Sequence, residues 1–144
     1  VLQVVSTTKT DKFSVVSTSF TDITGLSLSI TPSSTSSKIL ILSNFCCSFS
    51  TNSRIGYFNL VRDTTNIGQP SVSGSTTASY TYDQDQLHAV AINFLDTPNS
   101  TSSLTYKIQT KTNGSNDVTI TIGDRNSDDL DVISTITAME ISSW

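Results

Sequence analysis

The chain has 144 residues and a mass of 15.5 kDa, which suits one domain able to bury a core without disulfides or metal. Serine (26 residues) and threonine (23 residues) dominate, whereas glutamate and methionine occur once each, so the composition favours β-strands over helices. The formal net charge of −4 disfavours nucleic-acid or anionic-membrane partners. No apolar run approaches the roughly 20 residues that cross a bilayer, so we expect no membrane insertion.

The first third of the chain shows short strand patterns separated by clusters of small polar residues. We predict strands at 2–8, 13–20 and 26–30, a turn at 22–25 and a surface loop at 32–37. Residues 26–30 alternate apolar and polar side chains. This pattern predicts one buried and one solvated strand face.

The run 38–50 is the strongest candidate for a core strand. Its apolar residues occupy both faces, with Ile39, Ile41, Phe45 and Phe49 on odd positions and Leu40, Leu42 and Cys46 on even positions. Because adjacent strand residues point to opposite faces, the thiols of Cys46 and Cys47 should diverge and not bond.

The remaining strands are predicted from similar short runs. They are expected at 55–62, 87–95, 104–112, 117–122 and 133–141, with a polar irregular segment at 69–86 and a hairpin joining 104–112 to 117–122. The total is nine or ten strands in a single domain over residues 1–144. That number and spacing predict an all-β antiparallel sandwich of the jelly-roll type.

Two predicted strands, 38–50 and 87–95, are apolar on both faces, which a sandwich with one wet side cannot bury alone. We therefore expect other copies of the chain to cover the excess apolar surface. The candidate interface residues are Leu40, Leu42, Tyr57, Phe94 and the terminal Trp144.

A tyrosine-rich segment is the candidate ligand-binding site. Tyr80, Tyr82, Asp83 and Asp85 combine aromatic faces that can stack on sugar C–H surfaces with groups that accept hydrogen bonds from hydroxyls. Alternating tyrosines also occur on ordinary strand faces, so a structural role is the alternative.

No catalytic residue or cofactor is predicted, and we expect the chain not to be an enzyme. The single histidine, His88, lies in an apolar run and suggests no particular Ser and Asp partners. A minor alternative is a glycan depolymerase using Asp83 with Asp85, or Asp124 with Asp128, as its carboxylate pair.

The acidic segment 124–131 begins like a calcium-binding loop. It departs from that pattern at the sixth position, where Asp129 replaces Gly, and at the twelfth, where Thr135 replaces Glu. A looser calcium site at Asp128, Asp129 and Asp131 remains a candidate, and a solvated acidic loop is the alternative.

Five segments give the sequence a family likeness: LQVVSTTKTDKFS, SFTDITGLSLSITPSSTSSKILIL, YFNLVRDTTNIG, AVAINFLDTPNSTSSLTYKIQTKT and ISTITAMEI. Together they span nearly the whole chain. In their residues and their order they resemble a β-rich domain of tail-fibre and related virion proteins of tailed bacteriophages. The strand order is also similar, at the level of fold, to trimeric jelly-roll heads of the tumour-necrosis-factor type.

The resemblance implies a part of the virion, outside the cell, that attaches to a host. The domain would be the distal or C-terminal module of a longer fibre, or a small virion protein. It would form a homotrimer, contact other virion proteins and bind a cell-surface glycan or protein. The alternative is a purely structural virion part, such as a capsid or tail decoration or a fibre-folding module, that binds no ligand.

Overall fold

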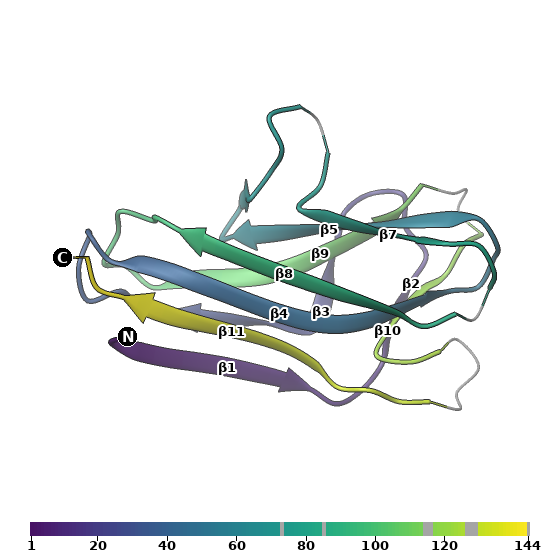
Figure 1. Cartoon of the computed structure of the whole chain (residues 1–144), viewed down its shortest axis with the longest axis horizontal. Coiled ribbons are helices and arrows are strands. Elements are labelled where there is room, and N and C mark those ends of the chain that lie inside the picture. The colour runs from purple at the N-terminus through teal and green to yellow at the C-terminus, as the bar shows by residue number, and fades with distance from the viewer. Residues whose placement is uncertain (73, 85, 114–116, 126–129, 144) are drawn as a thin grey trace.

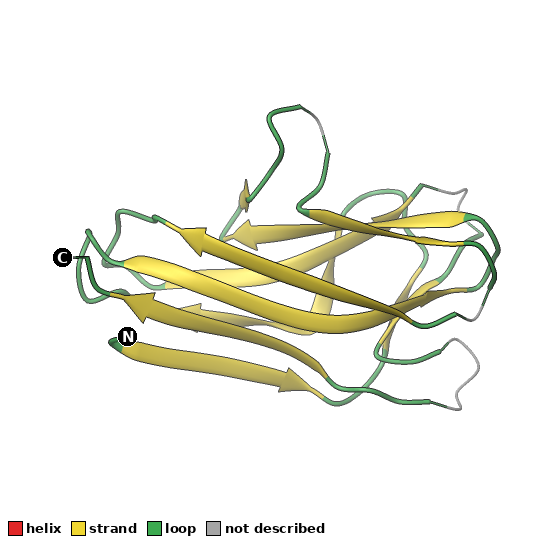
Figure 2. Ribbon diagram, viewed as in Figure 1, coloured by secondary structure: helices red, strands yellow, loops and turns green. Residues whose placement is uncertain are grey.

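The computed structural model describes residues 1–72, 74–84, 86–113, 117–125 and 130–143. These residues form eleven strands in two antiparallel sheets packed face to face, and they contain no helix (Figures 1 and 2). The predicted all-β sandwich is therefore confirmed. Consequently, no helix that could span a membrane occurs in this described part of the chain.

Sheet A is built around its long central strand, β4. Its members are β1 (Gln3–Lys9), β2 (Phe13–Val15), β4 (Lys38–Phe49), β8 (His88–Asp96), β10 (Ile120–Ile122) and β11 (Ser134–Ile141). β8 lies along one edge of β4, and β11 followed by β10 lies along the other. β1 pairs with β11 and β2 with β10, which completes the sheet.

Sheet B covers the inner face of sheet A. Its members are β3 (Thr21–Ile30), β5 (Arg54–Arg62), β6 (Thr65–Ile67), β7 (Thr77–Thr81) and β9 (Leu104–Thr112). The strand order is β3–β9–β5, and β6 and β7 pair with successive parts of β5. Each sheet draws its strands from both halves of the chain, so most neighbouring strands are distant in sequence (Figure 1).

The core lies between the two sheets and follows the predicted alternation of side chains. All four odd-position residues of β4 named above are buried, and the even-position Leu40, Leu42 and Cys46 are only half-buried on the outer face. Cys46 and Cys47 are both free thiols, as predicted from their opposite orientations. In sheet B, Leu26, Leu28 and Ile30 point inward.

Four predictions about the elements differ from the structure. The turn expected at 22–25 is a bulge inside β3, where the four residues between Asp22 and Ser27 stand opposite the single residue between Gln109 and Lys107. Gly25 takes a positive φ of 86° there, which glycine adopts without steric cost. The extra residues bring Ile23 and Leu26 to the same buried face.

The expected hairpin between 104–112 and 117–122 is wrong. β9 belongs to sheet B, whereas β10 pairs with β4 and β2 in sheet A. The chain crosses between the sheets here, and Val118 is fully buried along the way. In addition, β7 lies inside the segment expected to be irregular, and β2 ends at Val15, well short of residue 20.

Candidate functional site

The two outer faces of the sandwich differ in chemistry. On sheet A one row of outward positions is apolar, with Val4 54% exposed, Leu95 47% exposed and Leu40 half-buried. The next row along the strands is mostly polar, with Ser6, Thr137 and Asn93 beside Leu42. On sheet B the outward positions along β3 and β9 are polar, as at Ser29 and Lys107. A sheet face that water covers is normally polar, so the apolar row on sheet A is the unusual part of the surface.

The residues of this surface, which we call the apolar face, come from four adjacent strands. Strand register places Val4 opposite Met139, Met139 opposite Leu40, and Leu40 opposite Leu95. These four side chains therefore form one row across the sheet, because directly paired residues share a face. Leu42 lies two positions along β4 on the same face.

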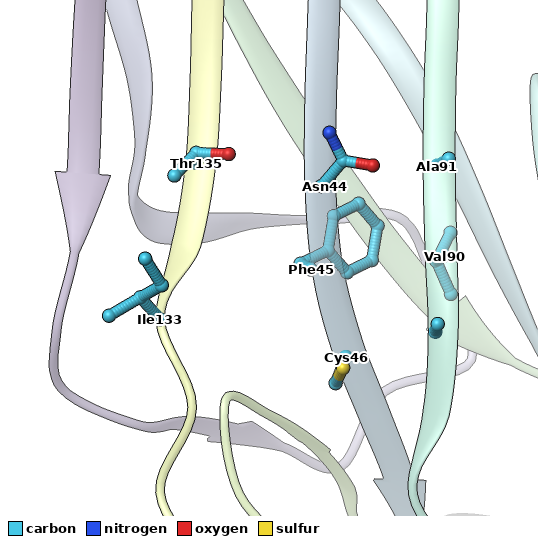
Figure 3. A pocket seen from close by; sticks show the side chains of 8 residues that line it. Asn44, Phe45, Cys46, Val90, Ala91, Ile133 and Thr135 are labelled. Atoms are coloured by element: carbon cyan, nitrogen blue, oxygen red, sulfur yellow. The ribbon is translucent and has the colours of Figure 1, made fainter.

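A shallow pocket of about 300 Å³ opens at one end of the apolar face (Figure 3). On one edge of β4, β11 pairs with Lys38–Asn44 and β10 pairs with Cys47–Phe49. The pocket lies at the break between these two ladders. The lining residues are Asn44, Phe45, Cys46, Ala89, Val90, Ala91, Ile133 and Thr135. The small side chains of Ala89 and Ala91 in β8 leave space for this pocket.

The thiol of Cys46 lies in this pocket and the neighbouring thiol of Cys47 in the core. Burial raises the pKa of both groups, that of Cys47 to about 12. Thiols protonated at neutral pH are weak nucleophiles. At neutral pH Cys46 is therefore a weak nucleophile, in a pocket whose other lining residues are mainly apolar.

The structure separates the predicted interface residues. Leu40 and Leu42 lie together on the apolar face. Phe94 points inward from β8 and packs against the core and Gly68, and Tyr57 lies on the opposite side of the molecule, on the outer face of sheet B. Trp144 lies outside the described residues.

The predicted ligand-binding tyrosines are both accessible. Tyr80 is 44% exposed and Tyr82 is 74% exposed, and their rings contact edge to face with centroids 4.9 Å apart. Asp83 is exposed beside them and accepts a hydrogen bond from Gln86. Asp85 lies outside the described residues.

Sequence reasoning missed a second aromatic group that adjoins these tyrosines. The ammonium of Lys111 lies 4.8 Å from the ring centroid of Phe20 and 5.4 Å from that of Tyr57. Phe20 directly precedes β3, Tyr57 lies in β5 and Lys111 lies in β9. The sequence pattern singled out Tyr57 only as a candidate interface residue, and it did not single out Phe20 or Lys111.

The candidate catalytic and metal-binding residues do not assemble a site within the described chain. His88 points inward at the start of β8, and its ring packs edge to face against Phe49. Asp124 is buried, with the ammonium of Lys12 3.7 Å away, and its backbone bridges to exposed Asp131.

The remaining acidic candidates, Asp128 and Asp129, lie outside the described residues. Among the residues that are described, no group of three His, Cys, Asp or Glu side chains could hold a metal ion. The calcium site predicted at Asp128, Asp129 and Asp131 therefore stays a prediction, since only Asp131 lies in the described part of the chain.

The sheets and their strand order define an antiparallel β-sandwich of the jelly-roll type. The chain is similar in fold to a chain of infectious bursal disease virus, Gx strain, with a TM-score of 0.50 and 12% identity over 98% of this chain and 37% of that one. It is also similar to a mutant VP2 protein of the same virus in derived T=1 particles, with a TM-score of 0.51 and 12% identity over 94% of this chain and 35% of that one.

The chain thus spans about a third of the length of these viral proteins. Neither a protein-family model nor a curated protein matches its sequence. At this identity the likeness establishes the fold.

Proposed function

We propose that the chain is a structural module of a virus particle that assembles as a homotrimer through the apolar face and attaches the particle to a host surface. The apolar face is the observation that carries the proposal. Val4, Leu40 and Leu95 form part of one continuous row on the solvent side of sheet A. Adjoining apolar side chains on a solvent-facing sheet surface often mark a contact with a partner.

A second copy of the chain is the simplest partner for this face. The row crosses β1, β11, β4 and β8 near one end of the sheet, so all four strands would contribute to one interface. Apolar residues at the centre and polar residues at the rim are the usual anatomy of a subunit contact. Three copies agree with the fold-level similarity to trimeric jelly-roll heads.

A location in the virion is supported by the fold of the viral neighbours, whose named source is a virus and, for one of them, a virus-derived particle. The resemblance of the sequence to tail-fibre modules points to the same kind of location. Contact with other virion proteins follows from this placement.

Attachment is assigned to the exposed tyrosines of sheet B, on the side opposite the proposed subunit contact. A trimer would present three such surfaces outward, and repetition strengthens weak single-site binding. We propose that the module acts by binding and not by catalysis. Its role as a purely structural part of the particle is the second candidate, favoured by the likeness to a protein of assembled particles.

The oligomeric state tests the subunit contact. Analytical ultracentrifugation of the wild-type chain should give a trimer, and Leu40→Glu should give a folded monomer because it places a charge in the apolar face. Ser29→Glu adds the same charge on the outer face of sheet B and should leave the trimer intact. A wild-type chain that stays monomeric at micromolar concentrations would overturn the contact.

Immunogold electron microscopy tests the location. Antibodies against the chain should label intact particles of the source virus at fixed positions. Labelling of infected cells but never of purified particles would contradict the virion role.

A further inference from the structure

We propose that the outer face of sheet B carries a binding site for a carboxylated glycan, formed by Lys111, Tyr57 and Tyr80 with the flanking Phe20 and Tyr82. The inference rests on the proposed attachment role and names the class of ligand. It adds a cation and two aromatic residues that the tyrosine-rich segment alone does not supply.

Strand register places these residues on one surface. Lys111 of β9 pairs with Tyr57 of β5, and Tyr57 pairs with Ala78 of β7. Tyr80 lies two residues beyond Ala78 and so projects from the same face of β7. With strands about 4.8 Å apart and about 6.6 Å between alternate residues, the Cα atoms of Lys111 and Tyr80 lie roughly 12 Å apart.

The charge at the centre of this surface is uncompensated. Among the described residues, no carboxylate oxygen lies within 4.0 Å of the Lys111 ammonium. Lys107, on the same strand and face, is instead held by Asp22 at 2.7 Å, and Asp22 also accepts a hydrogen bond from Gln109. Lys111 is therefore the cation that remains available for an incoming anion.

The aromatic rings orient this charge and add a stacking surface. Phe20 and Tyr57 hold the Lys111 ammonium through cation–π contacts, which stabilise a cation without neutralising it. Tyr80 is 44% exposed, and small, exposed Ala78 leaves space beside it. A ring face of this kind contacts the C–H surface of a sugar.

A glycan that carries carboxylates matches both features at once. Its carboxylate would accept a charge-assisted hydrogen bond from Lys111, while a neighbouring sugar ring stacks on Tyr80. The distance between the two residues suits a short stretch of a linear polysaccharide and exceeds a single sugar. A neutral glycan would leave the ammonium without an anion.

Glycan arrays that pair each uronate- or sialate-containing oligosaccharide with its methyl ester test the proposal, using the intact wild-type chain. We expect binding to at least one free acid and roughly tenfold weaker binding to its ester, because the ester removes the charge. Lys111→Gln should weaken binding to the acid by a similar factor, whereas Lys111→Arg should restore it. Tyr80→Ala should weaken binding to the acid and to the ester alike.

Lys107→Gln is the matched control, since it removes the same charge from the same strand where Asp22 already neutralises it. It should change binding less than twofold. Equal binding of acid and ester, unchanged binding by Lys111→Gln, binding only to peptide ligands, or no binding to any carboxylated glycan would each overturn the inference. The trimer and its position in the particle are measured independently, so those outcomes would leave the structural role standing.

Discussion

Arg62 and Asp96 join the two sheets through the core. Arg62 Nη1 of β5 donates hydrogen bonds of 2.8 and 2.7 Å to the two carboxylate oxygens of Asp96 in β8. The hydroxyl of Tyr106 donates a third bond of 2.7 Å to the same carboxylate. Asp96 is only 6% exposed, so this cluster satisfies a charge that water scarcely reaches.

Asp96→Asn should lower the free energy of unfolding by about 3 kcal/mol, because it leaves Arg62 partly buried without its counter-ion. Tyr106→Phe removes one hydrogen bond and should cost about 1 kcal/mol. Urea denaturation monitored by far-UV circular dichroism measures both changes in the free energy of unfolding. An Asp96→Asn variant as stable as wild type would contradict the cross-sheet role.

Glu140 should make stability depend on acid pH. Burial by itself raises its pKa, but hydrogen bonds from Ser33 Oγ (2.6 Å), the Ser33 backbone N–H (2.7 Å) and Gln3 Nε2 (2.6 Å) outweigh burial and hold the pKa at about 2. The ordinary value is 4.5. The folded state therefore favours the ionised form, and the resulting stability is present above pH 4.5 and is lost as pH falls toward 2.

Glu140→Gln should cost about 2 kcal/mol at pH 7, since charge-assisted bonds are lost, and progressively less as the pH falls below 4.5. Denaturant titrations of both proteins at pH 7 and pH 3 provide the comparison. If the stability difference is the same at the two pH values, the hydrogen bonds from Ser33 and Gln3 do not depend on the charge of the Glu140 carboxylate.

At Gly56 the backbone of β5 packs closely against side chains of sheet A. A Cβ at this position would lie 2.8 Å from Ile120 Cδ1 and 2.9 Å from Phe49 Cζ. Gly56→Ala should therefore destabilise the domain by about 1–3 kcal/mol through overpacking. Ser29→Thr adds one methyl group on an exposed strand face and should stay within about 0.5 kcal/mol of wild type; equal effects of the two changes would refute the steric argument.

Cys46 can report on the proposed subunit contact. Its thiol lines the pocket of the apolar face, whereas Cys47 is fully buried. Labelling with a maleimide should therefore modify Cys46 first, and the rate should fall as protein concentration rises and copies cover the face. Cys46→Ser should abolish this fast phase, and a labelling rate independent of concentration would count against self-association.

Local alternation predicted the buried and the outward face of β4 correctly. In β4 the odd and even positions were assigned to the correct faces because side chains alternate with a period of two. The bulge in β3 escaped prediction because it depends on the backbone conformation of Gly25 and on the need to bury both Ile23 and Leu26. No local pattern distinguishes such a bulge from a turn.

The sequence did not determine which strands pair with one another. The residues Asn113 to Asn116 are typical of a hairpin turn, but they do not specify which sheet receives the following strand. The cluster of Phe20, Tyr57 and Lys111 likewise depends on which strands are neighbours. Residues so far apart in sequence meet only through that pairing, so no local pattern could identify them as a group.

The long-range pairing of β4 has a consequence for how the domain folds. Ile41 pairs with Ala138 on one edge and with Phe94 on the other, so the central strand acquires its partners only after large loops have closed. Loop closure costs entropy before any contact repays it, and folds dominated by distant contacts reach the native state slowly, in milliseconds to seconds. Until β11 arrives, the edge of β4 is open to strands from other chains, so high concentrations during refolding would favour aggregation.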